Sequence, residues 1–365
     1  MTSPVRPPIA PMLARLTREL PLGSMSYEPK WDGFRCIAFV DVDGVDLRSR
    51  HDRPLARYFP ELVAGFEEVR ALRAGSEPSF VADGEIVLAE PSDHAGDGFS
   101  RLMTRLHPAA TRVDRLRRES PARFVAFDAL ADGSLDLRER PFVERRAALI
   151  RIVPDDHPVI TVTPSTRAPG AAVQWLADPG PGIDGVVAKP DDLPYQAGRR
   201  SMIKVKQLRT ADCVLAGIRA TDERGVTSLL LGLYDESGAL RHVGSVSQLK
   251  AADRRELLVE LRPLVVPLAE HPWRDGFTIG ASPLGRLPGS AARWMPDMEH
   301  DWLPLRPERV VEVGFDQVDG DRFRHPGRFI RWRPDRLAST CMIDQILPGR
   351  SSGEAGDRVI GELVG

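Results

Sequence analysis

The sequence has few cysteines and no long hydrophobic run. Its three cysteines, Cys36, Cys213 and Cys341, lie far apart and form no Cys-x-x-Cys spacing, which argues against a disulfide framework or a zinc site and favours a reducing compartment. No apolar stretch approaches the roughly 18 residues that a membrane-spanning helix needs. The segment 1–11 has no apolar signal core. We therefore expect a cytoplasmic protein with no membrane partner.

Lysine is also scarce. Of the 50 basic residues only five are lysines, namely Lys30, Lys189, Lys204, Lys206 and Lys250. A GC-rich coding bias accounts for the arginine excess, but four of the five lysines lie beside Gly and Asp or in a Lys-x-Lys pair. A lysine amine can lose its proton and act as a nucleophile, whereas arginine stays charged. The net charge of −2 does not by itself indicate a nucleic-acid binder, so positive charge would have to be local to serve one.

The length of 365 residues accommodates two domains, and the pattern of predicted strands and helices changes near residue 207. Residues 1–207 mix strands with helices, residues 208–348 hold short strands with one helix, and the Gly/Ser/Glu-rich segment 349–365 is expected to be flexible. In the first segment, periodicity predicts strands at 35–40, 45–49, 80–89, 123–130, 182–189 and 202–205, and helices at 55–73, 101–118 and 142–152. In the second it predicts strands at 213–218, 227–234, 240–246, 310–315 and 329–332, and a helix at 251–261. Five such strands with one helix fit an OB-fold barrel.

The first motif is the octapeptide from Glu28 to Arg35, which has the pattern E-x-K-x-D-G-x-R around Lys30. Lys30 lies between a predicted strand and a glycine turn, which places its amine at the mouth of a pocket. To attack phosphorus the amine must be neutral, and Lys204 and Lys206 supply the neighbouring positive charge that favours this state. Taken alone, the octapeptide fits a surface lysine beside a turn equally well.

Three further motifs each have an ordinary structural explanation. The segment 47–51, which contains Arg50, is typical of a solvated strand end. Asp83-Gly84-Glu85 places two carboxylates inside an apolar strand, where charge needs a partner such as a ribose hydroxyl or a metal ion. Phe127 precedes Asp128 in a run that otherwise indicates a core strand, although an adenine ring needs an aromatic face on which to stack.

Two lysine motifs follow. Asp184-Gly185 opens the run D-G-V-V-A-K, which also fits a hairpin turn. In a strand, the pair Lys204 and Lys206 places both ammonium groups on one face. Two like charges side by side favour a polyphosphate as their ligand, although a charged edge strand is the simpler interpretation.

In order along the chain, these motifs read K-x-D-G-x-R, S-R, D-G-E, F-D, D-G-V-V-A-K and K-x-K. This series closely resembles the motifs of covalent nucleotidyltransferases, which comprise ATP-dependent DNA ligases, RNA ligases and mRNA-capping enzymes. The resemblance extends over residues 10–336 and is strongest to ATP-dependent DNA ligases, in particular the short bacterial ligases related to mycobacterial ligase C. It implies an α+β nucleotidyltransferase domain, with ATP-grasp-like antiparallel sheets and helices, over 1–207. An all-β OB-fold barrel would follow over 208–348.

The resemblance also implies roles for residues of the first domain. Lys30 would be the nucleophile that becomes AMP-lysine, Glu28 would contact the adenine amino group, and Phe127 would stack on adenine. Arg35 and Arg50 would hold phosphate. The remaining ligands would be Glu85 for the ribose and a metal ion, Asp184 for the metal, and Lys204 and Lys206 for the ATP phosphates. The family has Glu where this chain has Asp184, which weakens the expectation of direct metal coordination.

A basic cluster lies near the C-terminus, where residues 322–336 hold six arginines and one acid interleaved with aromatic residues. A basic amphipathic strand pair or a phosphate-tracking surface would have this composition. Arg331, Arg333 and Arg336, with Asp335, also resemble the OB motif that closes over ATP in the family.

The resemblance therefore implies an enzyme that seals 5′-phosphate/3′-hydroxyl nicks in duplex DNA, using ATP with Mg²⁺ or Mn²⁺. It would act as a monomer in the bacterial cytoplasm, associated with the nucleoid and with DNA repair proteins as further partners. An RNA ligase, a capping-type guanylyltransferase and a non-catalytic OB-fold nucleic-acid binder remain alternatives. A Schiff-base lysine enzyme has no other support in the sequence.

Overall fold

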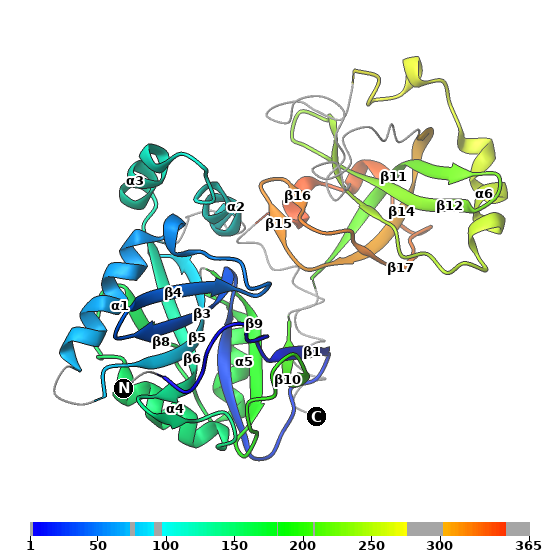
Figure 1. Cartoon of the computed structure of the whole chain (residues 1–365). Helices are drawn as coiled ribbons and strands as arrows, with labels where there is room; N and C mark the ends of the chain where they lie inside the picture. Colours follow the sequence, from blue (N-terminus) through cyan, green and yellow to red (C-terminus); the bar gives the residue numbers. More distant parts are fainter. Residues whose placement is uncertain are drawn as a thin grey trace. The chain divides into compact units, whose positions relative to one another are not determined.

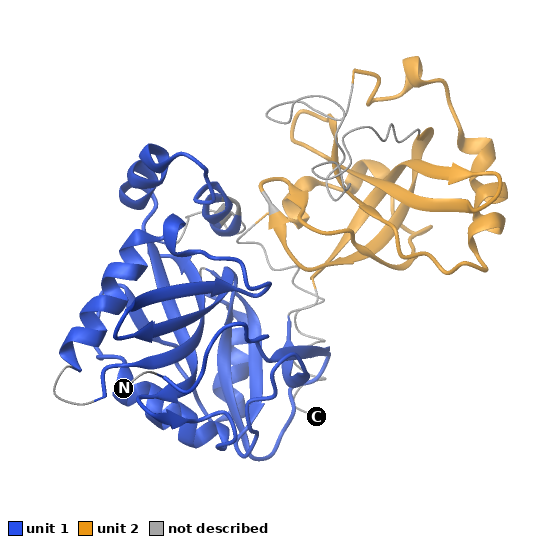
Figure 2. Cartoon of the chain, in the orientation of Figure 1, with its two compact units in different colours: residues 1–207, 363–365 blue, residues 208–362 orange. Residues whose placement is uncertain are grey.

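The computed structural model describes residues 3–73, 77–90, 97–180, 182–206, 209–275 and 302–347. The chain forms two compact units, of which the first holds residues 1–207 and the second begins at residue 208 (Figure 2). The segment 349–365, which the sequence predicts to be flexible, lies outside the described residues. Within the described part, no helix is both long and apolar enough to cross a membrane.

The first unit contains two sheets (Figure 1). The larger has the order β4-β3-β5-β6-β7, with β8 beside β6, and the smaller has the order β1-β10-β9-β2. The strands of the larger sheet are β3 (Phe34–Asp41), β4 (Gly44–Ser49), β5 (Phe80–Leu88), β6 (Ala122–Asp132), β7 (Leu135–Asp136) and β8 (Ile160–Val162). Those of the smaller sheet are β1 (Leu13–Thr17), β2 (Met25–Trp31), β9 (Ile183–Pro190) and β10 (Arg200–Val205).

Three apolar clusters hold the first unit together. One lies between the sheets and includes Ile37, Val81 and Met202, each from a different strand. A second packs the other face of the larger sheet against α1 (Pro60–Leu72) and α4 (Phe142–Ile152). The third packs the smaller sheet against α5 (Pro169–Ala177). The unit is therefore a layered α+β structure with the two sheets at its centre.

Two details differ from the expectations. Most pairings are antiparallel, but β1 pairs with β10 and β6 with β8 in parallel, so the sheets are not purely antiparallel. The single helix expected over 101–118 was wrong, because the chain forms α2 (Asp97–Thr104) and α3 (Ala110–Glu119) instead. Pro108 lies between them and has no amide hydrogen to continue a helix.

The second unit is built on a five-stranded antiparallel sheet with the order β13-β12-β11-β14-β17. Its strands are β11 (Arg209–Thr221), β12 (Gly225–Tyr234), β13 (Leu240–Val246), β14 (Leu303–Phe315) and β17 (Arg328–Trp332), and the short β15 (Val318–Asp319) and β16 (Arg322–Phe323) pair separately. Helix α6 (Arg254–Leu261) follows β13. Short 3-10 turns occur at Arg262–Leu264, Leu268–Glu270, Ala338–Thr340 and Ile343–Gln345, and at Ala56–Tyr58 in the first unit.

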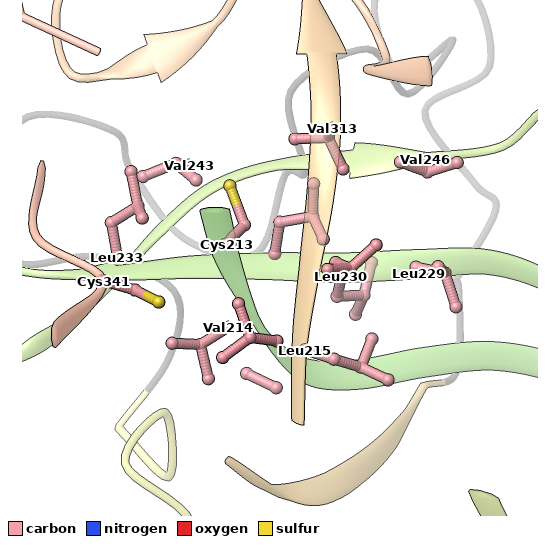
Figure 3. Packing of buried hydrophobic residues seen from close by; sticks show 14 of the residues in the cluster. Cys213, Val214, Leu215, Leu229, Leu230, Leu233, Val243, Val246, Val313 and Cys341 are labelled. Carbon is pink, nitrogen blue, oxygen red and sulfur yellow. The ribbon is translucent and has the colours of Figure 1, made fainter. Parts of the chain in front are cut away.

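One core stabilises the second unit. Leu230 and Val313 lie in it together with Cys213 and Cys341 (Figure 3), and all four are fully buried. Burying an aliphatic side chain of this size contributes about 1.5–3 kcal/mol. Both cysteines are free thiols, and burial raises the pKa of Cys341 to about 11, so they act as small apolar side chains here.

Candidate active site

Lys30 lies near the end of β2 and forms an ion pair with Asp184 on the neighbouring strand β9. The Lys30 Nζ donates to Asp184 Oδ1 at 2.6 Å, and the side chain of Lys30 keeps 22% of its exposure. The second oxygen of Asp184 lies 2.9 Å from the Nζ of Lys206, which directly follows β10. Because β9 pairs with both β2 and β10, the sheet brings one carboxylate between two amines that are 176 positions apart in the chain.

The glycines of the two Asp-Gly motifs are required by close backbone contacts. A Cβ on Gly33 would lie 2.0 Å from the carbonyl oxygen of Ile86. Gly185 has a φ of +148°, and a Cβ there would lie 2.3 Å from the carbonyl oxygen of Val205. Glycine at these positions lets the turn after Lys30 approach β5 and lets β9 approach β10 beside Asp184.

Glu28 is buried, with only 2% of its surface exposed, and is held by two cations. Its Oε2 lies 2.7 Å from the Nζ of Lys189, and its Oε1 accepts a hydrogen bond of 2.9 Å from Arg146 of α4. Burial raises the pKa of Glu28, and the two cations only partly offset this effect. Lys189 also donates to the carbonyl oxygen of Phe127 at 2.8 Å, so Glu28 is linked to the aromatic residue on β6.

Arg35 is fixed by a bidentate ion pair with Asp83. Its Nε and Nη2 lie 2.6 and 2.7 Å from the two oxygens of Asp83, which is fully buried and also accepts a hydrogen bond of 2.6 Å from Tyr195. Burial lowers the pKa of Arg35, but Asp83 more than compensates and raises it overall. The Arg35 guanidinium lies 4.3 Å from the centroid of the Phe127 ring, which is 9% exposed. Arg35 is therefore the partner that the buried carboxylate of Asp83 requires inside an apolar strand.

Glu85 lies opposite Arg35 in the β3–β5 pairing. Its Oε1 accepts a hydrogen bond of 3.2 Å from the backbone nitrogen of Gly33, next to the Lys30 motif. Burial raises the pKa of Glu85 to about 7, although Arg35 and Lys30 oppose the shift. The carboxyl group therefore titrates near neutrality.

The remaining predicted residues of the first unit are less enclosed. Arg50 directly follows β4 and is exposed. Lys204 is partly buried on β10, where it pairs with Val187 of β9, two positions before Lys206. Among the described residues, no group of three or more His, Cys, Asp and Glu side chains could hold a metal ion.

Arg331 and Arg333 belong to the second unit. Arg331 is 60% exposed, and its Nε lies 2.6 Å from Glu312 of β14. Arg333 is 17% exposed and places its Nη1 2.9 Å from both oxygens of Asp212 on β11, while its Nη2 contacts Asp335. Hydrogen bonding to Arg333 lowers the pKa of Asp335 to about 2.

The sequence motifs assign no role to Arg146, Asp83 or Lys189, although each contacts a predicted site residue. Tyr195, which also has no assigned role, contacts Asp83. The sequence does indicate that Asp83 needs a partner, because it lies inside an apolar strand, and Lys189 stands out as one of only five lysines. Arg146 lies within an ordinary helical stretch of arginines, where nothing local separates it from its neighbours.

Comparisons with known proteins agree with this geometry. The family described as "ATP dependent DNA ligase domain" matches residues 11–206, and "ATP dependent DNA ligase C terminal region" matches residues 222–336. DNA ligase C2 of Mycolicibacterium smegmatis is 48% identical, covering 98% of this chain and all of that protein. DNA ligase C of Mycobacterium tuberculosis is 46% identical, covering 95% of this chain and 96% of that protein.

A solved structure titled "Pmar-Lig_Pre." shares the fold, with a TM-score of 0.58 and 17% identity over 86% of this chain and 64% of that one. The family matches cover both units and decide between the alternatives that the motifs left open. The chain belongs to the ATP-dependent DNA ligase family.

Proposed function

We propose that the chain seals nicks between a 5′-phosphate and a 3′-hydroxyl in duplex DNA, with Lys30 as the residue that carries AMP. The observation that supports this role most directly is the contact between Lys30, Asp184 and Lys206. It places a nucleophilic amine, a proton acceptor and a phosphate-binding cation in one cluster.

The three steps follow from this arrangement. The Lys30 Nζ transfers a proton to Asp184 Oδ1 and attacks the α-phosphorus of ATP, so that an N–P bond forms and pyrophosphate leaves. An oxygen of the DNA 5′-phosphate then attacks the same phosphorus, which breaks the N–P bond and returns a proton to Nζ. Finally the 3′-hydroxyl oxygen attacks the activated 5′-phosphorus: a phosphodiester O–P bond forms, the P–O bond to AMP breaks, and the hydroxyl proton passes to solvent as AMP leaves. Each step requires in-line placement and neutralisation of phosphate charge, for which Lys204, Lys206 and Arg50 are available.

Glu28 and Phe127 would bind the adenine base. A carboxylate has about four lone-pair positions, so the contacts with Lys189 and Arg146 leave room to accept the adenine amino group. Phe127 offers an aromatic face for stacking. Because Arg35 already lies over the ring, adenine must take the other face or displace the guanidinium toward the phosphates.

Glu85 would contact the ribose, and the carboxylates of Asp184 and Glu85 suit Mg²⁺ or Mn²⁺. Mg²⁺ is commonly held by one or two carboxylates together with substrate phosphates, which is consistent with the lack of a larger cluster among the described side chains. Both oxygens of Asp184 contact ammonium groups, so metal binding there requires Lys30 to give up its proton or move. When bound, the ion would neutralise negative charge on the phosphates.

We propose that residues 1–207 are the adenylyltransferase domain and that residues 208–348 form an OB-fold. In support of the OB-fold, Val246 at the end of β13 forms a parallel bridge with Gly327, directly before β17. The Gly327 nitrogen donates to the carbonyl oxygen of Ser245 at 2.8 Å. This contact joins the two outer strands of the five-stranded sheet, as barrel closure requires.

The role of Lys30 is tested by incubation with α-³²P-ATP and Mg²⁺ or Mn²⁺, followed by a denaturing gel. Lys30→Arg keeps the positive charge but has no amine that can become neutral, so labelled protein should be absent. Lys250→Arg is the matched control, because Lys250 is an exposed lysine of the second unit and should label normally. Label on the folded Lys30→Arg protein would show that another residue carries AMP.

A further inference from the structure

Helices α2 and α3 form a projection at the opposite end of the first unit from α4 (Figure 1). The outer side of this projection, with the loop before α1, carries a set of exposed arginines. We call this set the arginine surface, and it consists of Arg53, Arg57, Arg112, Arg115, Arg117 and Arg118.

The projection is firmly attached to the rest of the unit through Arg105, whose side chain is fully buried. Its guanidinium lies 2.7 and 3.0 Å from the two carboxylate oxygens of Glu61 on α1. It also donates to the carbonyl oxygens of Tyr58 and Ser120, each at 2.8 Å. Arg57 donates to the carbonyl oxygen of Pro108 at 2.8 Å, so the loop before α1 lies against the α2–α3 connection. The arginines are therefore presented on a fixed support.

The arginine surface has an excess of positive charge. Val113 and Leu116 are the buried residues of α3, which leaves its arginines on the outer sides of the helix. Asp114 is shared by Arg117 and Arg118, and Glu119 contacts Arg115. Neither Arg53 nor Arg112 forms an ion pair with any described residue. Six arginines thus face two carboxylates in a chain whose net charge is −2.

The surface adjoins the site of Lys30. The loop that leads to Arg53 and Arg57 begins at Arg50, which is proposed to hold phosphate. On the other side, Phe99 of α2 makes an edge contact with Phe34, with ring centroids 5.4 Å apart. Phe34 belongs to the Lys30 motif, so α2 packs against the turn that follows Lys30.

We propose that the arginine surface binds backbone phosphates of duplex DNA beside the nick, an inference that rests on the proposed function. Guanidinium groups suit phosphate oxygens because their donors form a planar fork. A helix of ten residues, the length of α3, is about 15 Å long and can follow a duplex over almost half of its roughly 34 Å turn. Ion pairs between exposed side chains contribute little to stability, so the fold alone does not require this density of arginine.

The test uses the full-length protein with Arg112, Arg115 and Arg118 all changed to Gln, which removes three charges and keeps good helix formers. The control changes Arg140, Arg151 and Arg167 to Gln. These side chains are 55, 64 and 69% exposed and lie outside the surface, and the change in net charge is the same. Binding to nicked duplex DNA is measured without ATP over a series of salt concentrations, and labelling with α-³²P-ATP is measured without DNA.

Each phosphate contact contributes about 0.9 to the slope of log K against log salt on duplex DNA. The surface variant should therefore lose roughly 2 to 3 from this slope, whereas the control keeps the parental slope and both label normally. A parental slope in the surface variant would overturn the proposal. Equal loss in both variants would also overturn it, since net charge would then explain the effect. Failure of the parental protein to label would instead contradict the proposed chemistry, which the ATP-free binding experiment does not involve.

Discussion

Removing the Arg146 side chain should weaken ATP binding through Glu28, although Arg146 lies on a helix outside the motifs. Its Nη1 and Nη2 join Glu28 Oε1 to the carbonyl oxygen of Thr163, at 2.9 and 2.8 Å. Arg146→Ala leaves the buried Glu28 carboxylate with Lys189 as its cation. Loss of one partner of a buried ion pair costs 3–5 kcal/mol when no other remains, and a hydrogen bond to a charged group contributes about 1.5–3 kcal/mol. Because Lys189 stays, we expect a loss of about 2 kcal/mol.

If that loss falls on ATP binding, the KM for ATP in self-adenylylation should rise about 30-fold, since 1.4 kcal/mol corresponds to a factor of ten. The rate at saturating ATP should change little, because Lys30, Asp184 and Lys206 are untouched. Arg146→Lys should recover part of the effect, as it keeps the charge but cannot make both contacts. Arg151→Ala is the control on the same helix, because Arg151 is 64% exposed.

A nucleotide that lacks the 6-amino group distinguishes base recognition from general destabilisation. In the parental protein ATP should be preferred over this analogue, and in Arg146→Ala the preference should shrink, because Glu28 no longer holds its orientation. If Arg146 only supports the fold, both nucleotides lose activity by the same factor and the melting temperature falls in parallel. That outcome, or an unchanged KM, would refute the reasoning.

Two further predictions concern the same unit. Phe127→Ala should weaken ATP use several-fold, because stacking contributes about 1 kcal/mol. Phe127→Tyr keeps an aromatic ring and should reduce ATP use only slightly. An equal loss of ATP use in both variants, with a lower melting temperature, would indicate that the ring has a purely structural role. The pKa of Glu85 rises from 4.5 to about 7 in the folded protein. Between pH 4.5 and pH 7 the native state therefore keeps a proton on Glu85 that the unfolded state has lost. Metal-free parental protein should therefore lose stability as pH rises from 4.5 to 7, by at most about 3 kcal/mol and by less because the side chain is partly exposed. Urea unfolding of Glu85→Gln should therefore show a smaller decrease in the free energy of unfolding between pH 5 and pH 8 than the parental protein shows. The same decrease in both proteins would contradict the prediction.

Local pattern predicted the strands well because their side chains alternate over short distances. The expected strand at 240–246 coincides with β13, and the helix expected at 142–152 coincides with α4. The start of β14 at Leu303 was missed by seven residues, because its first half holds two prolines and three charged residues and buries only Leu305. Alternation carries little signal where a strand buries a single side chain.

The candidate site was predictable only where its residues form a local motif. The sequence could propose that Lys30 and Lys206 act together, but their common partner Asp184 depends on the pairing of β9 with β2 and β10. Glu28 shows the same limit more strongly. Its cations come from α4 and the far end of β9, and no spacing in the sequence specifies such a contact. Long-range ion pairs follow from the assembled layers, so single-sequence patterns do not reveal them.

The C-terminal arginines allow a final prediction, because the structure assigns different surroundings to two residues that the motif treats alike. Arg333 is largely enclosed, and Asp212 would lose a partner on both oxygens without it. Arg331 is 60% exposed and contacts one carboxylate. Arg333→Ala should therefore lower the melting temperature of the second unit, whereas Arg331→Ala should leave it almost unchanged, since exposed ion pairs contribute about 0–1 kcal/mol.

Arg331 is thus the residue whose loss reports function without unfolding. If it serves ATP closure, Arg331→Ala should reduce labelling by α-³²P-ATP and spare the sealing of a nick whose 5′ end is already adenylylated, because that step expels no pyrophosphate. If it tracks DNA phosphates instead, labelling stays normal while DNA binding weakens and its salt dependence becomes shallower. We expect the first result, because the Arg-x-Arg-x-Asp-Arg order resembles the family's OB motif. Normal labelling of the folded Arg331→Ala protein would exclude a role for this side chain in the first step.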